Sequence, residues 1–140
     1  MSLNYGIAWS DDYKLDNKQV DRQHYKLFEM AGKLVGLCTD AGDEAQLRQM
    51  LDFLVNYTVQ HFNDEEALQI KYNYPDYKRH KQLHENFKAT VGDMVKKFNE
   101  GESPVELSGE INKIVVKWLI NHISYEDKKI GAHIRKCEME

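Results

Sequence analysis

The stretch "YTVQHFNDEEALQI" (57–70) places polar groups where a helix should be hydrophobic. One row of side chains through it recurs every three or four residues, which is the spacing of the buried face of an amphipathic helix. The row contains Leu47, Leu51, Leu54, Thr58, His61, Glu65, Leu68 and Tyr72. His61 and Glu65 are four residues apart, so the imidazole and the carboxylate lie one turn apart on that face. Both groups need a partner inside the protein.

The rest of the chain shows the same helical spacing in four long segments. They cover residues of about 18–38, 43–71, 75–99 and 104–130. The breaks between them are "TDAGDE" (39–44), "KYNYPDY" (71–77) and "NEGESP" (99–104). We therefore predict an all-α fold, an antiparallel up-down-up-down four-helix bundle. We expect a single domain (1–140) with an N-terminal arm (1–16). The large side chains of Trp9 and Tyr13 could hold this arm against the bundle.

Composition excludes several classes of protein. The formal net charge of −4 gives no basic surface for nucleic acid. The chain has no run of about 18 apolar residues that could span a membrane. Its first residues, "MSLNYGIAWSDDYK" (1–14), lack the basic start and apolar block of a signal peptide. We expect a cytoplasmic protein.

The two cysteines are far apart in the sequence and form no CxxC motif, so they predict neither a disulfide framework nor a zinc knuckle. Cys38 falls on an apolar helical row and is expected to be a buried thiol. Cys137 lies in a polar tail and receives no role.

Five of the six histidines fall on the apolar rows of the four helices. They are His24, His61, His80, His84 and His122. A lone histidine in such a row is usually a hydrogen-bonded core residue. Five are different, because each unpaired buried imidazole costs about 1–3 kcal/mol. The sum would be a large part of a total stability of about 5–15 kcal/mol. A metal centre removes this cost by using the nitrogens as ligands.

The spacing of these groups indicates two metal ions. His80 and His84 are four residues apart and present two nitrogens on one face, and His61 with Glu65 repeats this geometry. Each pair alone is a weak signal, but the set spread over four helices is strong. Five imidazoles and two carboxylates are too many for one ion. Nitrogen and oxygen ligands favour iron, manganese, cobalt or zinc.

The second carboxylate has two candidates in "WLINHISYEDKK" (118–129). In a regular α-helix, Glu126 lies about 40° from His122 and Asp127 lies about 140° from it. Helical geometry alone therefore favours Glu126.

Four motifs together resemble the hemerythrin family, and in particular its single-domain bacterial members. They are "VDRQHYKLF" (20–28), "HFNDEE" (61–66), "HKQLH" (80–84) and "WLINHISYEDK" (118–128). The combination of H, HxxxE, HxxxH and HxxxxD is specific, whereas each part alone is not. The similarity covers nearly the whole chain, including Trp9.

The resemblance implies a centre of two iron ions. His80, His84 and His122 would hold one iron. His24 and His61 would hold the other, which keeps a position for dioxygen. Glu65 and Asp127 would bridge the two irons together with an oxo or hydroxo group, and Leu119 would cover the dioxygen pocket.

Because the family spacing HxxxxD selects Asp127, we predict a π-bulge between His122 and Asp127 that turns this carboxylate inward. Asp21, Gln23 and Tyr57 are candidates for hydrogen bonds to the ligand imidazoles. Glu66, next to Glu65, is expected to face solvent.

The resemblance also implies a function: reversible dioxygen binding for oxygen storage, transport or supply. We expect a monomer that binds its ligand and is not an enzyme. The alternatives are oxygen or redox sensing, and a di-iron enzyme that acts on peroxide or nitric oxide. An enzyme would need an acid or tyrosine in the pocket, for which Tyr57, Tyr72 and Tyr77 are candidates.

Overall fold

The computed structural model describes residues 14–15, 17–39 and 44–139. Trp9 and Tyr13, which the sequence suggested as contacts of the N-terminal arm, lie outside these ranges.

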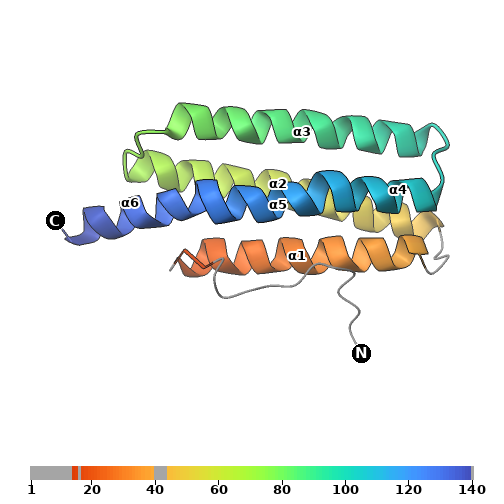
Figure 1. Cartoon of the computed structure of the whole chain (residues 1–140), viewed down its shortest axis with the longest axis horizontal. Coiled ribbons are helices and arrows are strands. Elements are labelled where there is room, and N and C mark those ends of the chain that lie inside the picture. The colour runs from red at the N-terminus through yellow and green to blue at the C-terminus, as the bar shows by residue number, and fades with distance from the viewer. Residues whose placement is uncertain (1–13, 16, 40–43, 140) are drawn as a thin grey trace.

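Within the described ranges all regular secondary structure is helical, and the helices form four long rods (Figure 1). The first three rods are α1 (Lys18–Thr39), α2 (Glu44–Lys71) and α3 (Tyr77–Asn99). The fourth rod is continuous and consists of α4 (Pro104–Glu110), η2 (Ile111–Val116), α5 (Lys117–Asn121), η3 (His122–Asp127) and α6 (Lys128–Met139). The rods lie side by side and alternate in direction, so the predicted all-α bundle is confirmed. The fourth rod is longer than expected, because His133 and Cys137 belong to α6 and not to a tail.

Local sequence explains how α2 ends and how α4 begins. After α2, Asn73 has φ 51°, a left-handed conformation that asparagine tolerates well. There the backbone N–H of Tyr74 donates to the carbonyl of Gln69 at 2.9 Å. Before α4, the hydroxyl of Ser103 accepts a hydrogen bond from the backbone N–H of Glu106, with Pro104 in the first turn.

The hydrophobic core has two parts of unequal size. The larger part contains side chains of all four rods, from Leu27 on α1 to Ile123 on η3. The smaller part consists of Tyr74, Ile130 and Ile134. Buried histidines and carboxylates lie between the two parts, so the bundle has a polar layer in its interior. Cys38 is buried in the larger part as expected, and burial raises the pKa of its thiol to about 11.

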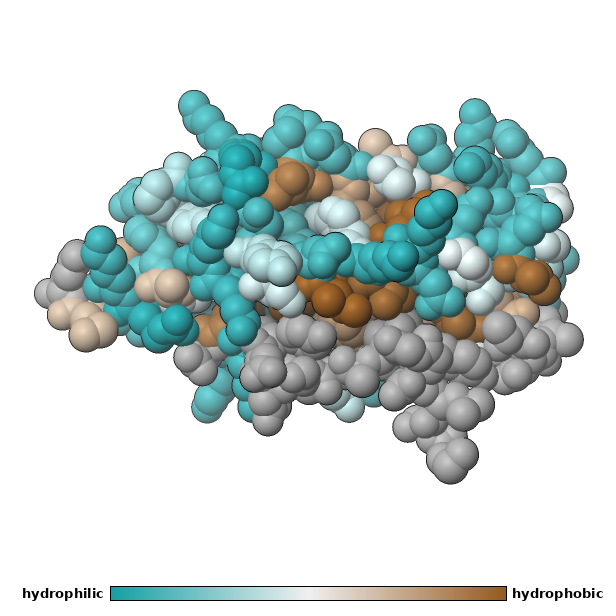
Figure 2. All heavy atoms as spheres, in the orientation of Figure 1, coloured by the Kyte–Doolittle hydropathy of each residue, from teal (hydrophilic) through white to brown (hydrophobic). Residues whose placement is uncertain are grey.

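The face in Figure 2 is mostly covered by hydrophilic side chains, with hydrophobic residues visible between the rods. None of the helices in the described ranges is long and apolar enough to cross a membrane.

Gly131 marks a close contact between α6 and the segment that precedes α1. A Cβ atom built on Gly131 would lie 2.9 Å from the carbonyl oxygen of Leu15 and 3.3 Å from its Cα. Leu15 is buried, and its backbone N–H donates to the Asp21 carboxylate at 2.7 Å. Glycine is therefore needed at 131 for space, and no positive φ is involved.

We expect Gly131→Ala to lower the free energy of unfolding by about 1–3 kcal/mol, because the methyl group would push against backbone atoms. Gly92→Ala is the matched control. Nothing lies within 4 Å of a Cβ at Gly92, which is in the middle of α3. It should therefore stabilise the protein by about 0.5–1 kcal/mol through helix propensity. Thermal and urea unfolding of both variants measures the difference. Equal effects of the two substitutions would contradict the close contact.

Candidate metal centre

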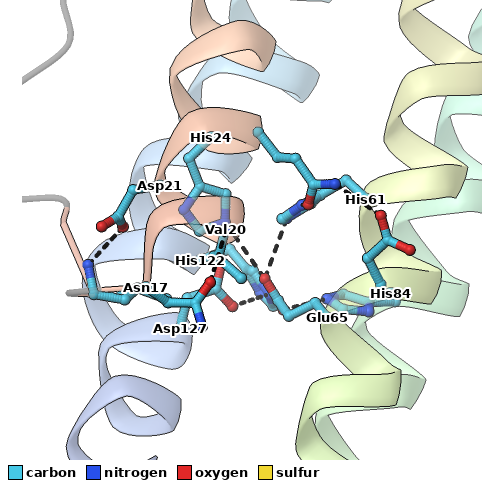
Figure 3. A network of polar contacts seen from close by, with 12 residues as sticks. Asn17, Val20, Asp21, His24, His61, Glu65, His84, His122 and Asp127 are labelled. Carbon is cyan, nitrogen blue, oxygen red and sulfur yellow. Dashed lines mark hydrogen bonds and ion pairs between the residues drawn. The ribbon is translucent and has the colours of Figure 1, made fainter.

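The seven sequence-predicted ligands converge in the polar layer of the bundle. They are His24 on α1, His61 and Glu65 on α2, His80 and His84 on α3, and His122 and Asp127 on η3. All seven side chains are buried. Figure 3 shows the labelled members pointing toward one another from different rods. The residues that the sequence singled out as ligands are therefore brought together by the fold.

Glu65 lies at the centre of this group, and its two oxygens face different histidines. Its Oε1 is 2.9 Å from Nε2 of His80 and 3.2 Å from Nε2 of His84. Its Oε2 is 3.1 Å from Nε2 of His61 and 3.4 Å from Nε2 of His24. The carboxylate thus separates a pair of histidines on α3 from a pair on α1 and α2.

Asp127 repeats this division. Its Oδ1 is 3.0 Å from Nε2 of His80 and 3.0 Å from Nε2 of His122, whereas its Oδ2 is 3.1 Å from Nε2 of His24. The side chains therefore form two overlapping groups that share both carboxylates. One group has three histidines and the other has two.

The nitrogen and oxygen atoms of this cluster are better suited to bind metal ions than to form hydrogen bonds with one another. Nε2 of His24 and of His84, Oε2 of Glu65 and both oxygens of Asp127 are buried and make no hydrogen bond. Each such atom would cost about 1–3 kcal/mol without a partner. In addition, Nε2 of His80 and of His122 are 2.9 Å apart. Two nitrogen ligands at about 2.0–2.1 Å from one metal ion and at about 90° to each other have this separation.

Without metal, the cluster compensates its charges with protons. Burial opposes protonation of His24, but the carboxylates of Asp127 and Glu65 outweigh it and raise its pKa to about 9. The same balance raises the pKa of His80 to about 9. Burial lowers the pKa of His61, and the neighbouring carboxylate of Glu65 offsets this effect only in part. Burial alone would raise the pKa values of both carboxyl groups, yet the surrounding histidines hold them below their usual range.

A π-helix turns Asp127 toward the centre. The segment η3 spans His122–Asp127, as the π-bulge prediction required. Asp127 is buried, while Glu126 is directed to the surface of α3 and pairs with the guanidinium of Arg79. The choice of Glu126 from regular helical geometry is therefore wrong, because the extra residue in the turn rotates the next carboxylate inward.

Two hydrogen bonds orient the ligand imidazoles. Nδ1 of His61 is 2.7 Å from Oε1 of Gln23, whose amide also donates to Asp64 at 2.7 Å. Nδ1 of His84 is 2.8 Å from Oε2 of Glu66. Such bonds fix the ring and leave Nε2 free for the metal.

These contacts confirm one expectation and correct others. Gln23 is a partner of a site histidine as predicted, but Asp21 instead accepts from the backbone of Leu15. Tyr57 stacks on Phe53 at a centroid distance of 6.4 Å. Glu66 was expected to face solvent and is in fact buried, because α2 packs against α1 and α3 and buries a wide stripe of its surface.

Aromatic rings support the three-histidine group. Phe62 stacks on His84 at 3.8 Å, and Trp118 stacks on His122 at 4.2 Å. Phe87 also stacks on this indole, at 3.9 Å. Leu119, the residue expected to cover a dioxygen pocket, is buried in the larger core.

Sequence reasoning missed Glu66 and Tyr74. Tyr74 is buried, and its ring meets the ring of His80 edge-on at 6.4 Å. The signal for Glu66 was its position four residues after Phe62, on the edge of the buried row. No helical row indicated Tyr74, because it belongs to the turn after α2.

A four-helix bundle with a buried cluster of histidines and carboxylates defines a class of proteins that bind metal in the bundle core. Residues 15–134 match the family model "Hemerythrin HHE cation binding domain". The chain belongs to the hemerythrin family.

Several proteins of this family are similar to the chain over most of its length. The bacteriohemerythrin of Methylococcus capsulatus (strain Bath) is 35% identical over 111 residues, which cover 79% of this chain and 82% of the relative. The bacteriohemerythrin of Stenotrophomonas maltophilia is 30% identical, covering 96% of this chain and 88% of the relative. A hemerythrin-like protein of Naegleria gruberi is 29% identical, covering 86% and 87%.

The role of the π-helix can be tested with deletions. Removing the exposed Tyr125 should convert η3 to an α-helix, with Asp127 still inward because it would then follow His122 by four residues. Removing Lys129, outside η3, should rotate Ile130 and Ile134 by about 100°. We expect the first deletion to keep metal binding. The second should lower the free energy of unfolding by about 2–5 kcal/mol for each displaced side chain. The metal content after refolding and the thermal unfolding curve measure the two effects. Loss of metal in the Tyr125 deletion, with metal retained in the Lys129 deletion, would contradict the role of η3.

Metal uptake should release protons. Since the pKa values of His24 and His80 are raised to about 9, both imidazoles carry a proton at pH 7 in the metal-free protein. A metal must displace these protons, so its affinity should rise with pH until about pH 9. We expect the release of about two protons per chain at pH 7. Calorimetric titration in two buffers with different ionisation enthalpies measures this number, and a heat that does not depend on the buffer would contradict it.

Proposed function

We propose that the chain holds two iron ions and binds dioxygen reversibly at this centre. One iron would be bound by His80, His84 and His122, the other by His24 and His61, and Glu65 and Asp127 would bridge them. Family membership and the two overlapping ligand groups support this proposal. Two ferrous ions can supply the electrons that dioxygen accepts when it binds.

The observation that carries the proposal is the unequal number of histidines in the two groups. Both groups share the same two carboxylates, yet one has three imidazoles and the other has two. A second metal with fewer protein ligands keeps a coordination position for a small molecule, as functional metal sites do. A purely structural site would be expected to use the full set of ligands on both ions.

The protein around the centre suits a binding site that excludes water. The larger core adjoins it, and Leu119 and Phe62 are almost fully buried. Water and protons promote the irreversible loss of reduced oxygen species, so an apolar surround favours release of dioxygen unchanged. The function would then be the storage, transport or supply of dioxygen.

An enzymatic function, with peroxide or nitric oxide as substrate, is the second candidate. Tyr74 favours it, because this buried tyrosine has a ring contact with His80. A phenol at that position could donate a proton or an electron. Tyr72, in contrast, donates its hydroxyl hydrogen bond to Glu138.

The decisive measurement begins with the di-ferrous protein under anaerobic conditions. Dioxygen is admitted and then removed, while optical spectra are recorded. We expect bands that appear with dioxygen and disappear after its removal, over several cycles. Irreversible oxidation with release of peroxide would contradict the proposal, and its suppression by Tyr74→Phe would favour the enzyme.

His61→Ala should abolish the dioxygen adduct, because it removes one of only two imidazoles in the smaller group. His133→Ala is the matched control, since His133 contacts the carbonyl of Tyr72 and belongs to neither group. The control should bind dioxygen as the wild type does. A normal adduct in His61→Ala would refute the ligand assignment.

A further inference from the structure

Gln69 is a buried polar residue that the metal centre described above does not use. Its side chain is fully buried, and neither its amide oxygen nor its amide nitrogen makes a hydrogen bond. It follows Glu65 by four residues on α2, so it lies one turn further along the same face. A hydrophobic side chain of the same size would be more stable at such a position.

His80 also has a buried polar atom without a hydrogen bond. Its Nε2 faces Glu65 and Asp127, whereas its Nδ1 is buried without a hydrogen bond. An imidazole that binds metal through Nε2 carries a proton on Nδ1, and this N–H normally donates to an acceptor. His61 and His84 have such partners in Gln23 and Glu66. His80 has none among the described residues.

The packing of α2 against α3 places Gln69 and His80 at the same level of the bundle. The two helices are antiparallel, and His84 contacts Phe62 and Glu65 of α2. One turn earlier on α3 therefore corresponds to one turn later on α2. His80, one turn before His84, also faces Oε1 of Glu65 and lies at the level of the turn that holds Gln69.

Tyr74 connects the two residues independently. Its backbone N–H donates to the main-chain carbonyl of Gln69 at 2.9 Å, and its ring meets the ring of His80 at 6.4 Å. Both residues thus border one small region between the metal centre and the smaller core of Tyr74, Ile130 and Ile134.

We propose that Gln69 is a positioning residue for the three-histidine metal site, and that its amide is linked to Nδ1–H of His80 through one buried water. A water is needed because the two side chains make no direct bond. A buried water typically needs two to four polar partners, and Gln69 and His80 supply two. The link would fix the orientation of His80 with Nε2 toward the metal. This inference rests on the proposed metal centre.

The link gives the amide of Gln69 a role in the metal-bound protein. When Nε2 of His80 binds the metal, its Nδ1–H would donate to the water, and the water would donate to the amide oxygen of Gln69. Removing the amide should therefore weaken the metal site.

The test uses Gln69→Met, which keeps the length of the side chain and removes its polar atoms. We expect a loss of about 10–100-fold in affinity for Co²⁺ or Fe²⁺ measured by competition with a chelator, as for other partners of metal-bound histidines. An affinity equal to that of the wild type would overturn the proposal.

Two other Gln→Met substitutions bracket this result. Gln23→Met removes a partner that is already bonded to His61, so it should lower both the melting temperature and the metal affinity. Gln49→Met changes an exposed residue of α2 and should alter neither. Gln69→Glu restores an acceptor, so it should recover most of the affinity while it lowers the melting temperature of the metal-free form.

A spectroscopic signature separates positioning from simple packing. In the Co²⁺-loaded wild type, the exchangeable Nδ1–H proton of His80 should give a hyperfine-shifted NMR signal that exchanges slowly with solvent. Gln69→Met should lose the signal or speed its exchange at least several-fold, while the signals of His61 and His84 stay. An unchanged His80 signal, or a metal-loaded crystal structure without water between Gln69 and His80, would overturn the proposal.

These measurements use no dioxygen, so they are separate from the test of function. A chain that binds two metal ions but forms no reversible adduct would refute the proposed oxygen binding and leave the role of Gln69 intact. A wild type that binds no metal would refute both.

Discussion

The structure depends on two ionised carboxylates in the interior of a four-helix bundle. Glu65 and Asp127 are almost completely enclosed, and their oxygens face histidine nitrogens from all four rods. A buried carboxylate is costly unless a positive charge compensates it. In the metal-free chain, protons on His24 and His80 supply that charge. Two metal ions would supply this positive charge in the same place with stronger bonds. The centre of the core is therefore suited to hold ions and is not stabilised by hydrophobic contacts.

This requirement accounts for the π-helix η3 in the fourth rod. A regular helix that places His122 inward would direct Asp127 away from the centre by about 140°. The π-helix η3 brings both side chains to the same side and sends Glu126 to Arg79. After η3, Ile130 and Ile134 still pack in the smaller core. The local geometry of η3 thus follows from the chemistry of the site.

Much of this arrangement could be predicted from the sequence, because helical periodicity reports both the fold and the inward rows. His61 and Glu65 stood out since they interrupt an apolar row, and the same pattern located His80 and His84. Geometry alone failed at Asp127, where a π-helix breaks the periodicity on which it relied, and only the spacing of a known family indicated the correct residue. It also failed for Glu66, because the width of a buried stripe depends on how closely neighbouring rods pack. The link proposed between Gln69 and His80 joins two rods, and no sequence pattern encodes such a link.

The two ligand groups differ in how firmly the protein holds them. Phe62 and Trp118 stack on His84 and His122, so rings of the three-histidine group are fixed by aromatic contacts as well as by Glu66. In the other group, His61 is held by one hydrogen bond that its Nδ1–H donates to Gln23, and both ring nitrogens of His24 lack a hydrogen bond. Rigid support of one ligand group and lighter support of the other match the unequal number of histidines. Any change of coordination on binding a small molecule should therefore be concentrated at His24 and His61, while the side chains of the three-histidine group keep their positions.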